Sequence, residues 1–166
     1  MNIVLIGMPG CGKSTVGVVL AKALEYSFID SDLIIQRREK MSLQKIINSK
    51  GIKSFLKAEE DAVFTIFEDD AVIATGGSVV YSDKAMTYLK ENGIVIYLRL
   101  PFEEIEKRLV NIKTRGVAME KGATLLSLFK ERTPLYEKWA DITIDTSGLT
   151  LEETVERIID TAKKEM

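Results

Sequence analysis

Short apolar runs alternate along the chain with longer segments in which apolar positions recur every three or four residues. The runs predict buried strands, and the segments between them have the spacing of amphipathic helices. The predicted strands cover residues 2–6, 27–30, 71–75, 93–98 and 142–145. The predicted helices cover residues 13–24, 31–50, 53–67, 82–91, 103–109, 125–136 and 151–164. Gly51 separates the second of these helices from the third.

This alternation of strands and helices predicts crossover connections and a parallel sheet covered on both faces. The length of 166 residues suggests one domain over 1–166, of the doubly wound α/β class. Ligands of such sheets lie beyond the carboxyl ends of the strands. We therefore expect the functional residues in the loops that follow residues 6, 29, 75 and 145.

The first of these loops reads GMPGCGKS and lies between a predicted strand and a predicted helix. This spacing in this context predicts a phosphate-binding loop whose backbone N–H groups face a nucleotide phosphate. Lys13 is placed to reach the β- and γ-phosphates, and the Ser14 hydroxyl to bind Mg²⁺. The other predicted contacts come from Gly10, Cys11, Gly12 and Thr15, with Thr15 near the α-phosphate and Cys11 without a redox role.

Three classes of protein use such a loop. GTPase switches usually carry later D-x-x-G and N-K-x-D motifs, and neither is present in this sequence. Large mechanical ATPases need a longer chain. The length therefore favours a kinase that phosphorylates a small molecule.

Two carboxylates follow the second predicted strand, in SFIDSDLII. One of Asp30 and Asp32 can hold Mg²⁺ through water, and the other can accept a hydrogen bond or a proton from an attacking hydroxyl. The alternative is that one of them caps the following helix, and both roles can hold together. The third predicted strand runs into Gly76, Gly77 and Ser78, where two glycines allow the backbone to approach a ligand closely.

The basic stretch KRLVNIKTRGVAMEKG predicts a lid over about 109–123 that folds over phosphates. Arg108 and Arg115 flank its first part, and arginine is suited to phosphate contact and to stabilising transferred charge. Solvated surface arginines are the alternative reading. Arg132 lies on the helix before the fifth strand.

Composition narrows the remaining classes of function. The net charge of −2 gives no electrostatic case for nucleic-acid binding, and no apolar run is long enough to span a membrane. The absence of histidine excludes a histidine base or metal ligand. The single cysteine and the N-terminus, which has neither a basic region nor a cleavage site, lead us to expect a cytoplasmic protein.

The ordered set of motifs resembles the shikimate kinase family over nearly the whole chain. It comprises GMPGCGKST, the DSD of residues 30–32, the ATGG of residues 74–77, the two lid arginines and RTPLYEKWAD from residue 132. The resemblance implies a three-layer P-loop kinase fold with the sheet order 2-3-1-4-5 and a helical acceptor-binding region at about 31–60. It implies transfer of the γ-phosphate of ATP, with Mg²⁺, to a hydroxyl of shikimate in aromatic amino-acid biosynthesis.

The same resemblance implies a role for each matching residue. Lys13 and Ser14 would serve ATP and Mg²⁺, and Asp30 would lie near the metal. On the acceptor side, Asp32 would hold hydroxyls and Arg132 would pair with the carboxylate. Gly76 and Gly77 would approach the acceptor ring. Arg108 would lie against the adenine, and Arg115 would lie over the phosphates. We expect a monomer.

Three positions depart from the family pattern. Leu56 stands where the family has an arginine that grips the acceptor carboxylate, Ser78 replaces a third glycine, and Arg115 is followed by Gly-Val-Ala rather than Pro-Leu-Leu. Lys57 is next to Leu56, but one helical step turns it away by about 100°. Three alternatives therefore stay open. The protein is a kinase of another hydroxy acid, hydroxyl amino acid or sugar acid, a nucleoside monophosphate kinase, or a catalytically weak nucleotide-binding regulator.

Overall fold

The structure, a computed structural model, describes residues 1–109 and 116–165. Its centre is a sheet of five strands in the order β2-β3-β1-β4-β5, and every pair of neighbours is parallel. The strands are β1 (Asn2–Ile6), β2 (Ser27–Asp30), β3 (Ala71–Ala74), β4 (Gly93–Arg99) and β5 (Ile142–Asp145). This confirms the fold class and the predicted strand order.

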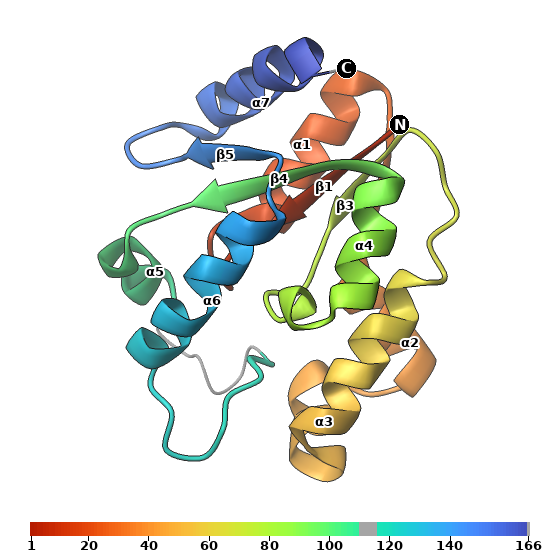
Figure 1. Ribbon diagram of the computed structural model, residues 1–166, viewed down its shortest axis with the longest axis vertical. Helices are drawn as coiled ribbons and strands as arrows, with labels where there is room; N and C mark the ends of the chain where they lie inside the picture. The colour runs from red at the N-terminus through yellow and green to blue at the C-terminus, as the bar shows by residue number, and fades with distance from the viewer. Residues whose placement is uncertain (110–115, 166) are drawn as a thin grey trace.

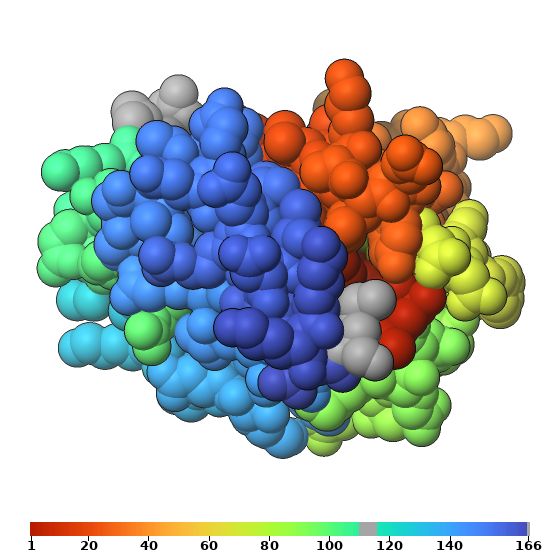
Figure 2. All heavy atoms as spheres, turned by 90° about the horizontal axis from the view of Figure 1, so that it is seen from above, coloured from red at the N-terminus to blue at the C-terminus, as the bar shows by residue number. Residues whose placement is uncertain are grey.

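Helices cover both faces of the sheet and give the fold three layers (Figure 1). On one face, α1 (Lys13–Leu24) lies beside α7 (Leu151–Glu165), as Figure 2 shows from above. The other face is covered by α4 (Asp83–Glu91) and α6 (Leu125–Trp139). The remaining elements border the carboxyl edge of the sheet. They are α2 (Ser31–Glu39), α3 (Leu43–Val63), η1 (Val79–Tyr81) and α5 (Phe102–Arg108).

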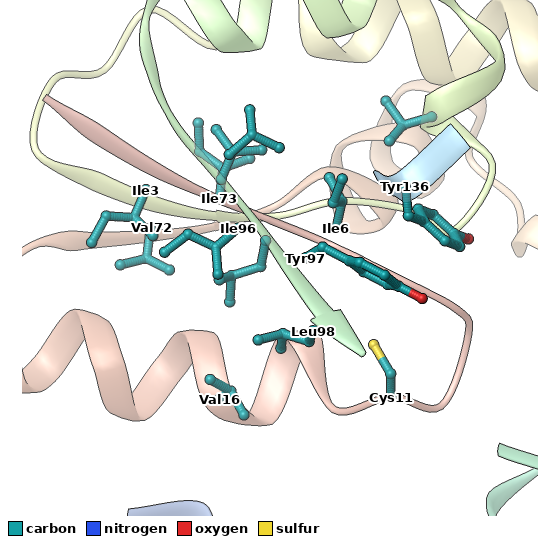
Figure 3. Packing of buried hydrophobic residues seen from close by; sticks show 14 of the residues in the cluster. Ile3, Ile6, Cys11, Val16, Val72, Ile73, Ile96, Tyr97, Leu98 and Tyr136 are labelled. Carbon is teal, nitrogen blue, oxygen red and sulfur yellow. The ribbon is translucent and has the colours of Figure 1, made fainter. Parts of the chain in front are cut away.

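The core lies between the sheet and these two helical layers. Every residue of β1 is buried, as expected for a central parallel strand. Figure 3 shows Val16 of α1 and Leu98 of β4 pointing toward one another in one layer. In the other layer, the rings of Tyr97 and Tyr136 stack with their centroids 5.2 Å apart. The sheet is thus a rigid base for the loops at its carboxyl edge.

The largest error of the sequence-based prediction is in the segment 31–67. The single helix predicted over 31–50 is broken, because Lys40 adopts a left-handed conformation with φ of 55° and Ser42 then caps α3 by accepting a hydrogen bond from the Lys45 N–H. The interruption predicted at Gly51 is a kink with φ of 83° inside α3, which continues to Val63. This break and kink let α2 and α3 fold back on each other beside the sheet edge.

The other boundaries agree with prediction to within a few residues, and among the elements of residues 1–109 and 116–165 only the short η1 was not predicted. None of the helices in the two described ranges combines the length and the apolar character that crossing a membrane requires.

Candidate active site

A cavity of about 500 Å³ opens at the carboxyl edge of the sheet. It brings together the phosphate loop, one carboxylate of α2, the glycine turn after β3 and a buried arginine of α6. The lining residues that were predicted from the sequence are Gly10, Gly12, Lys13, Ser14, Thr15, Asp32, Gly76, Gly77, Ser78, Arg108 and Arg132. Segments that are distant in sequence therefore meet in one site, as the strand order requires.

The phosphate loop has the backbone that its glycines allow. Gly10 and Gly12 have φ values of 79° and 100°, which other residues rarely adopt. Lys13 begins α1, and its ammonium group donates hydrogen bonds to the carbonyls of Gly7 and Met8 at 2.7 and 2.9 Å. The loop thus holds a buried positive charge at the amino end of a helix, where an anion is favoured.

Cys11 packs beneath this loop and is 3% exposed. A methyl carbon added to Gly7 would lie 2.8 Å from its sulfur, so the cysteine fills the space under the turn. Cys11 therefore has a packing role here, and the absence of a redox role stays a prediction.

Asp30 caps the following helix, which is the alternative role that the sequence left open, and it also contacts the phosphate loop. As the N-cap of α2, it accepts a hydrogen bond from the Asp32 N–H at 2.9 Å through Oδ1. Its other oxygen, Oδ2, accepts from the Ser14 hydroxyl at 3.0 Å. The carboxylate is therefore fixed beside the phosphate loop by the start of a helix.

Asp32 lines the cavity together with Glu59, a residue to which the sequence analysis assigned no role. Glu59 is 2% exposed and lies on α3 four residues after Phe55, which also lines the cavity. Burial, and then the charge of Asp30, raise the pKa of Asp32 to about 6. Burial raises the pKa of Glu59 to about 7, although a hydrogen bond from Ser78 opposes the shift. The signal in the sequence that could have identified Glu59 was its spacing of four residues from Phe55.

The glycines after β3 are required by close contacts. A methyl carbon at Gly76 would lie 2.1 Å from Oε2 of Glu59, and one at Gly77 would lie 2.9 Å from Nη1 of Arg132. Ser78, the departure from a third glycine, donates its hydroxyl to Oε1 of Glu59 at 2.6 Å. Its side chain is therefore turned to the carboxylate and is 4% exposed.

Arg132 is 1% exposed, which is unusual for a guanidinium group. It donates to the carbonyl of Ala118 at 2.9 Å and to the hydroxyl of Tyr81 at 3.3 Å. Within residues 1–109 and 116–165, no carboxylate lies within ion-pair distance of it. Tyr136 helps to shape this wall by donating to the carbonyl of Gly77 at 2.6 Å.

Arg108 lies between the main cavity and a smaller one of about 210 Å³. Its guanidinium donates to the carbonyl of Gly10 at 3.4 Å. The smaller cavity is bordered by α1 and by the segment from β5 into α7, including Thr15, Thr146 and Leu149. Of the predicted lid, residues 116–118 line the main cavity, whereas Arg115 lies outside the described residues.

Comparison with known proteins identifies the family to which this site belongs. A protein-family model described as shikimate kinase matches residues 9–163. The chain belongs to the shikimate kinase family. It is accordingly an ATP-dependent phosphotransferase with an alcohol acceptor.

Two relatives of the shikimate kinase family match the chain over nearly its whole length. A shikimate kinase from Thermodesulfovibrio yellowstonii is 40% identical and is aligned over 95% of this chain and 92% of its own. The structure of a shikimate kinase from Acinetobacter baumannii in complex with shikimate has a TM-score of 0.90 at 32% identity, covering 99% of this chain and 93% of that one. The human threonine synthase-like 1 is 34% identical over 98% of this chain, which spans only 22% of that longer protein.

Neither of the two lysines near the departure at Leu56 lines the main cavity. Lys57 forms surface ion pairs with Glu60 and Asp61 at 3.2 and 2.8 Å. Lys53 lies with Lys57 along a different surface hollow. Leu56 itself lines a third cavity of about 230 Å³, which shares Glu59 and Ser78 with the main one. Among the described residues, Arg132 is therefore the one buried cation on the acceptor side of the cavity.

Proposed function

We propose that this shikimate kinase family member transfers the γ-phosphoryl group of ATP to a hydroxyl of shikimate. The observation that carries the proposal is a single cavity with the phosphate loop at one end, the Asp32 carboxylate beside it and the buried Arg132 guanidinium in its wall. An acceptor that fits these groups has a hydroxyl for Asp32 and a carboxylate for Arg132. The solved relative in complex with shikimate supports the same choice.

The nucleotide side fits ATP. The positive φ values of Gly10 and Gly12 turn the loop around a phosphate, and Lys13 supplies a positive charge within it. We assign Lys13 to the β- and γ-phosphates, with Cys11 and Thr15 as loop contacts. We assign the 210 Å³ cavity next to Arg108 to the adenine base.

The fit to Mg²⁺ depends on hard oxygen ligands. The Ser14 hydroxyl and the Asp30 carboxylate lie 3.0 Å apart beside the loop, and both are ligand types that Mg²⁺ accepts, together with water and phosphate oxygens. No cluster of three carboxylate, histidine or cysteine ligands occurs among the described residues, which suits an ion held partly by nucleotide. Bound Mg²⁺ would neutralise charge on the phosphates.

The protein contributes mainly positioning and electrostatics, as phosphoryl transfer requires. Asp32 accepts a hydrogen bond from the attacking hydroxyl and orients it toward the loop. Gly76 and Gly77 let the acceptor approach the backbone, and Arg132 makes charge-assisted hydrogen bonds with the acceptor carboxylate. Lys13 lies where charge develops on the transferred group.

Three expectations from the sequence stay proposals. Arg115 is assigned to the lid over the phosphates on the basic pattern of the loop and on the family resemblance. The chain is expected to act as a monomer, which light scattering of the purified protein tests. A cytoplasmic location is expected from the single cysteine, and cell fractionation tests it.

A coupled assay of ADP release tests the function. Shikimate is compared with a panel that contains other hydroxy acids, sugar acids and hydroxyl amino acids, at saturating MgATP. We expect shikimate to give the highest kcat/KM and Asp32→Ala to lower turnover by orders of magnitude while the protein stays folded. A panel member with a clearly higher kcat/KM than shikimate would assign another acceptor.

A further inference from the structure

Glu59 is a buried carboxylate that forms no ion pair with any residue in 1–109 or 116–165. Its Oε1 accepts the 2.6 Å hydrogen bond from Ser78, while Oε2 is buried and has no hydrogen-bond partner among the described residues. In that same part of the chain, no lysine or arginine nitrogen lies within ion-pair distance of it. An ionised carboxylate is costly to bury with one hydrogen bond, whereas the neutral acid is not.

The unpartnered oxygen of Glu59 lies against Gly76, beside the acceptor part of the cavity. A methyl carbon at Gly76 would contact both Oε2 of Glu59 and Oδ1 of Asp32, at 2.1 and 2.9 Å. Oδ1 of Asp32 is also buried and without a partner in the described ranges. Two carboxyl groups thus lie together in the wall beside the space where the acceptor must lie, and their charges oppose each other.

The charged groups around Glu59 come from every element packed against it. Asp32 of α2 disfavours its ionised form, while Arg132 of α6 and Lys13 of α1 favour that form from beyond ion-pair distance. On its own helix, Lys57 and Glu60 pair with each other at the surface. Burial outweighs the favourable contributions and keeps the pKa of Glu59 near 7.

Leu56 and Ser78, two of the departures from the family pattern, are neighbours of this one carboxyl group. Leu56 is three residues before Glu59 on α3, so both lie on one side of the helix. Leu56, Glu59 and Ser78 border the same 230 Å³ cavity. Position 56 offers Glu59 a leucine and no cation, whereas Ser78 gives it a hydroxyl. Both departures therefore alter the surroundings of Glu59.

We propose that Glu59 is a specificity-determining residue that must be neutral, with its proton held in the cavity, for the anionic acceptor to bind. This inference rests on the proposed function. With Glu59 neutral, Arg132 is sufficient to hold the acceptor carboxylate. With Glu59 ionised, the acceptor would enter a cavity that already contains two negative charges. Loss of the proton therefore weakens acceptor binding, in proportion to the neutral fraction.

The first test is the pH dependence of KM and kcat for shikimate between pH 6 and 9, at saturating MgATP. We expect KM to be level below about pH 7 and to rise toward tenfold per pH unit above it, because the neutral fraction falls by that factor. Glu59→Gln fixes a neutral side chain, so its KM should not vary over this range. Ser78→Ala removes a hydrogen bond that favours ionisation and should move the rise to higher pH. Asp61→Asn, a surface change on the same helix, should keep the wild-type profile.

The second test is calorimetric titration with shikimate at pH 8 in two buffers of different ionisation enthalpy. The wild type should take up close to one proton per shikimate bound, and Glu59→Gln should take up none. A purely structural role for Glu59 would not produce this uptake.

A KM that stays level from pH 6 to 9 in the wild type would overturn the inference while leaving the kinase function intact. The same conclusion follows if Glu59→Gln keeps the wild-type rise or the proton uptake. Absence of shikimate-dependent ADP release at every pH would instead overturn the proposed function, and this inference with it.

Discussion

Arg132 offers a prediction in which function and stability change in opposite directions. The residue buries a positive charge at 1% exposure, and no carboxylate in the described ranges pairs with it. We consider Arg132→Met, which keeps a long apolar stem and removes the charge.

The magnitude follows from the contacts of the guanidinium. Loss of its hydrogen bonds to the Ala118 carbonyl and the Tyr81 hydroxyl costs about 1 kcal/mol each. Removal of an unpaired buried charge returns several kcal/mol, so the folded protein should be as stable as the wild type or more stable. A charge-assisted hydrogen bond to the acceptor carboxylate contributes about 1.5–3 kcal/mol, which corresponds to a rise in KM of about 10- to 100-fold.

The assay combines thermal unfolding with steady-state ADP release. At the same concentration, shikimate should raise the Tm of Arg132→Met much less than that of the wild type. Lys130→Met removes one exposed charge from the same helix and should behave as the wild type. A variant Arg132→Met that unfolds at a much lower temperature and retains the wild-type KM would refute the reasoning and make Arg132 a structural residue.

Three further predictions test other parts of the site. Lys13→Ala should lower kcat by orders of magnitude and retain the circular dichroism spectrum. The control Lys22→Ala, at the exposed end of α1, should be as active as the wild type. Equal activity of the two variants would show that Lys13 has no role in catalysis. Gly76→Ala should lower kcat/KM for the acceptor strongly, because its methyl group would lie 2.1 Å from Glu59, and wild-type kinetics would contradict that contact. The free energy of unfolding should fall as the pH rises from about 4 to 7. The folded protein holds protons on Asp32 and Glu59, whose pKa values are about 6 and 7, whereas the unfolded chain releases these protons near pH 4. In Glu59→Gln that fall, measured by urea unfolding, should be smaller, and an identical slope would argue against the raised pKa.

Much of the architecture followed from local patterns. A parallel sheet buried on both faces requires short apolar strands, and these are easy to recognise because they lie between amphipathic helices. The phosphate loop was equally clear, since its glycines and Lys13 must be close in sequence to act together. The break after Lys40 was missed because left-handed backbone at a lysine has no strong sequence signal.

The acceptor side could be predicted only in part. Asp32 and Arg132 were identified from motifs, but the contact between Ser78 and Glu59 joins positions that are 19 residues apart. Such a contact depends on how α3 packs against the turn after β3, which no local pattern encodes. The meaning of Leu56 likewise became clear only when the structure placed it beside Glu59 and turned Lys57 to the surface.

The most direct test of the central claim is to measure the products of a reaction of the protein with MgATP and shikimate, by phosphorus NMR. The account predicts one phosphorylated shikimate for each ADP formed, and loss of both products in Asp32→Ala. ADP formed at the same rate without shikimate, or with no phosphorylated acceptor, would contradict it.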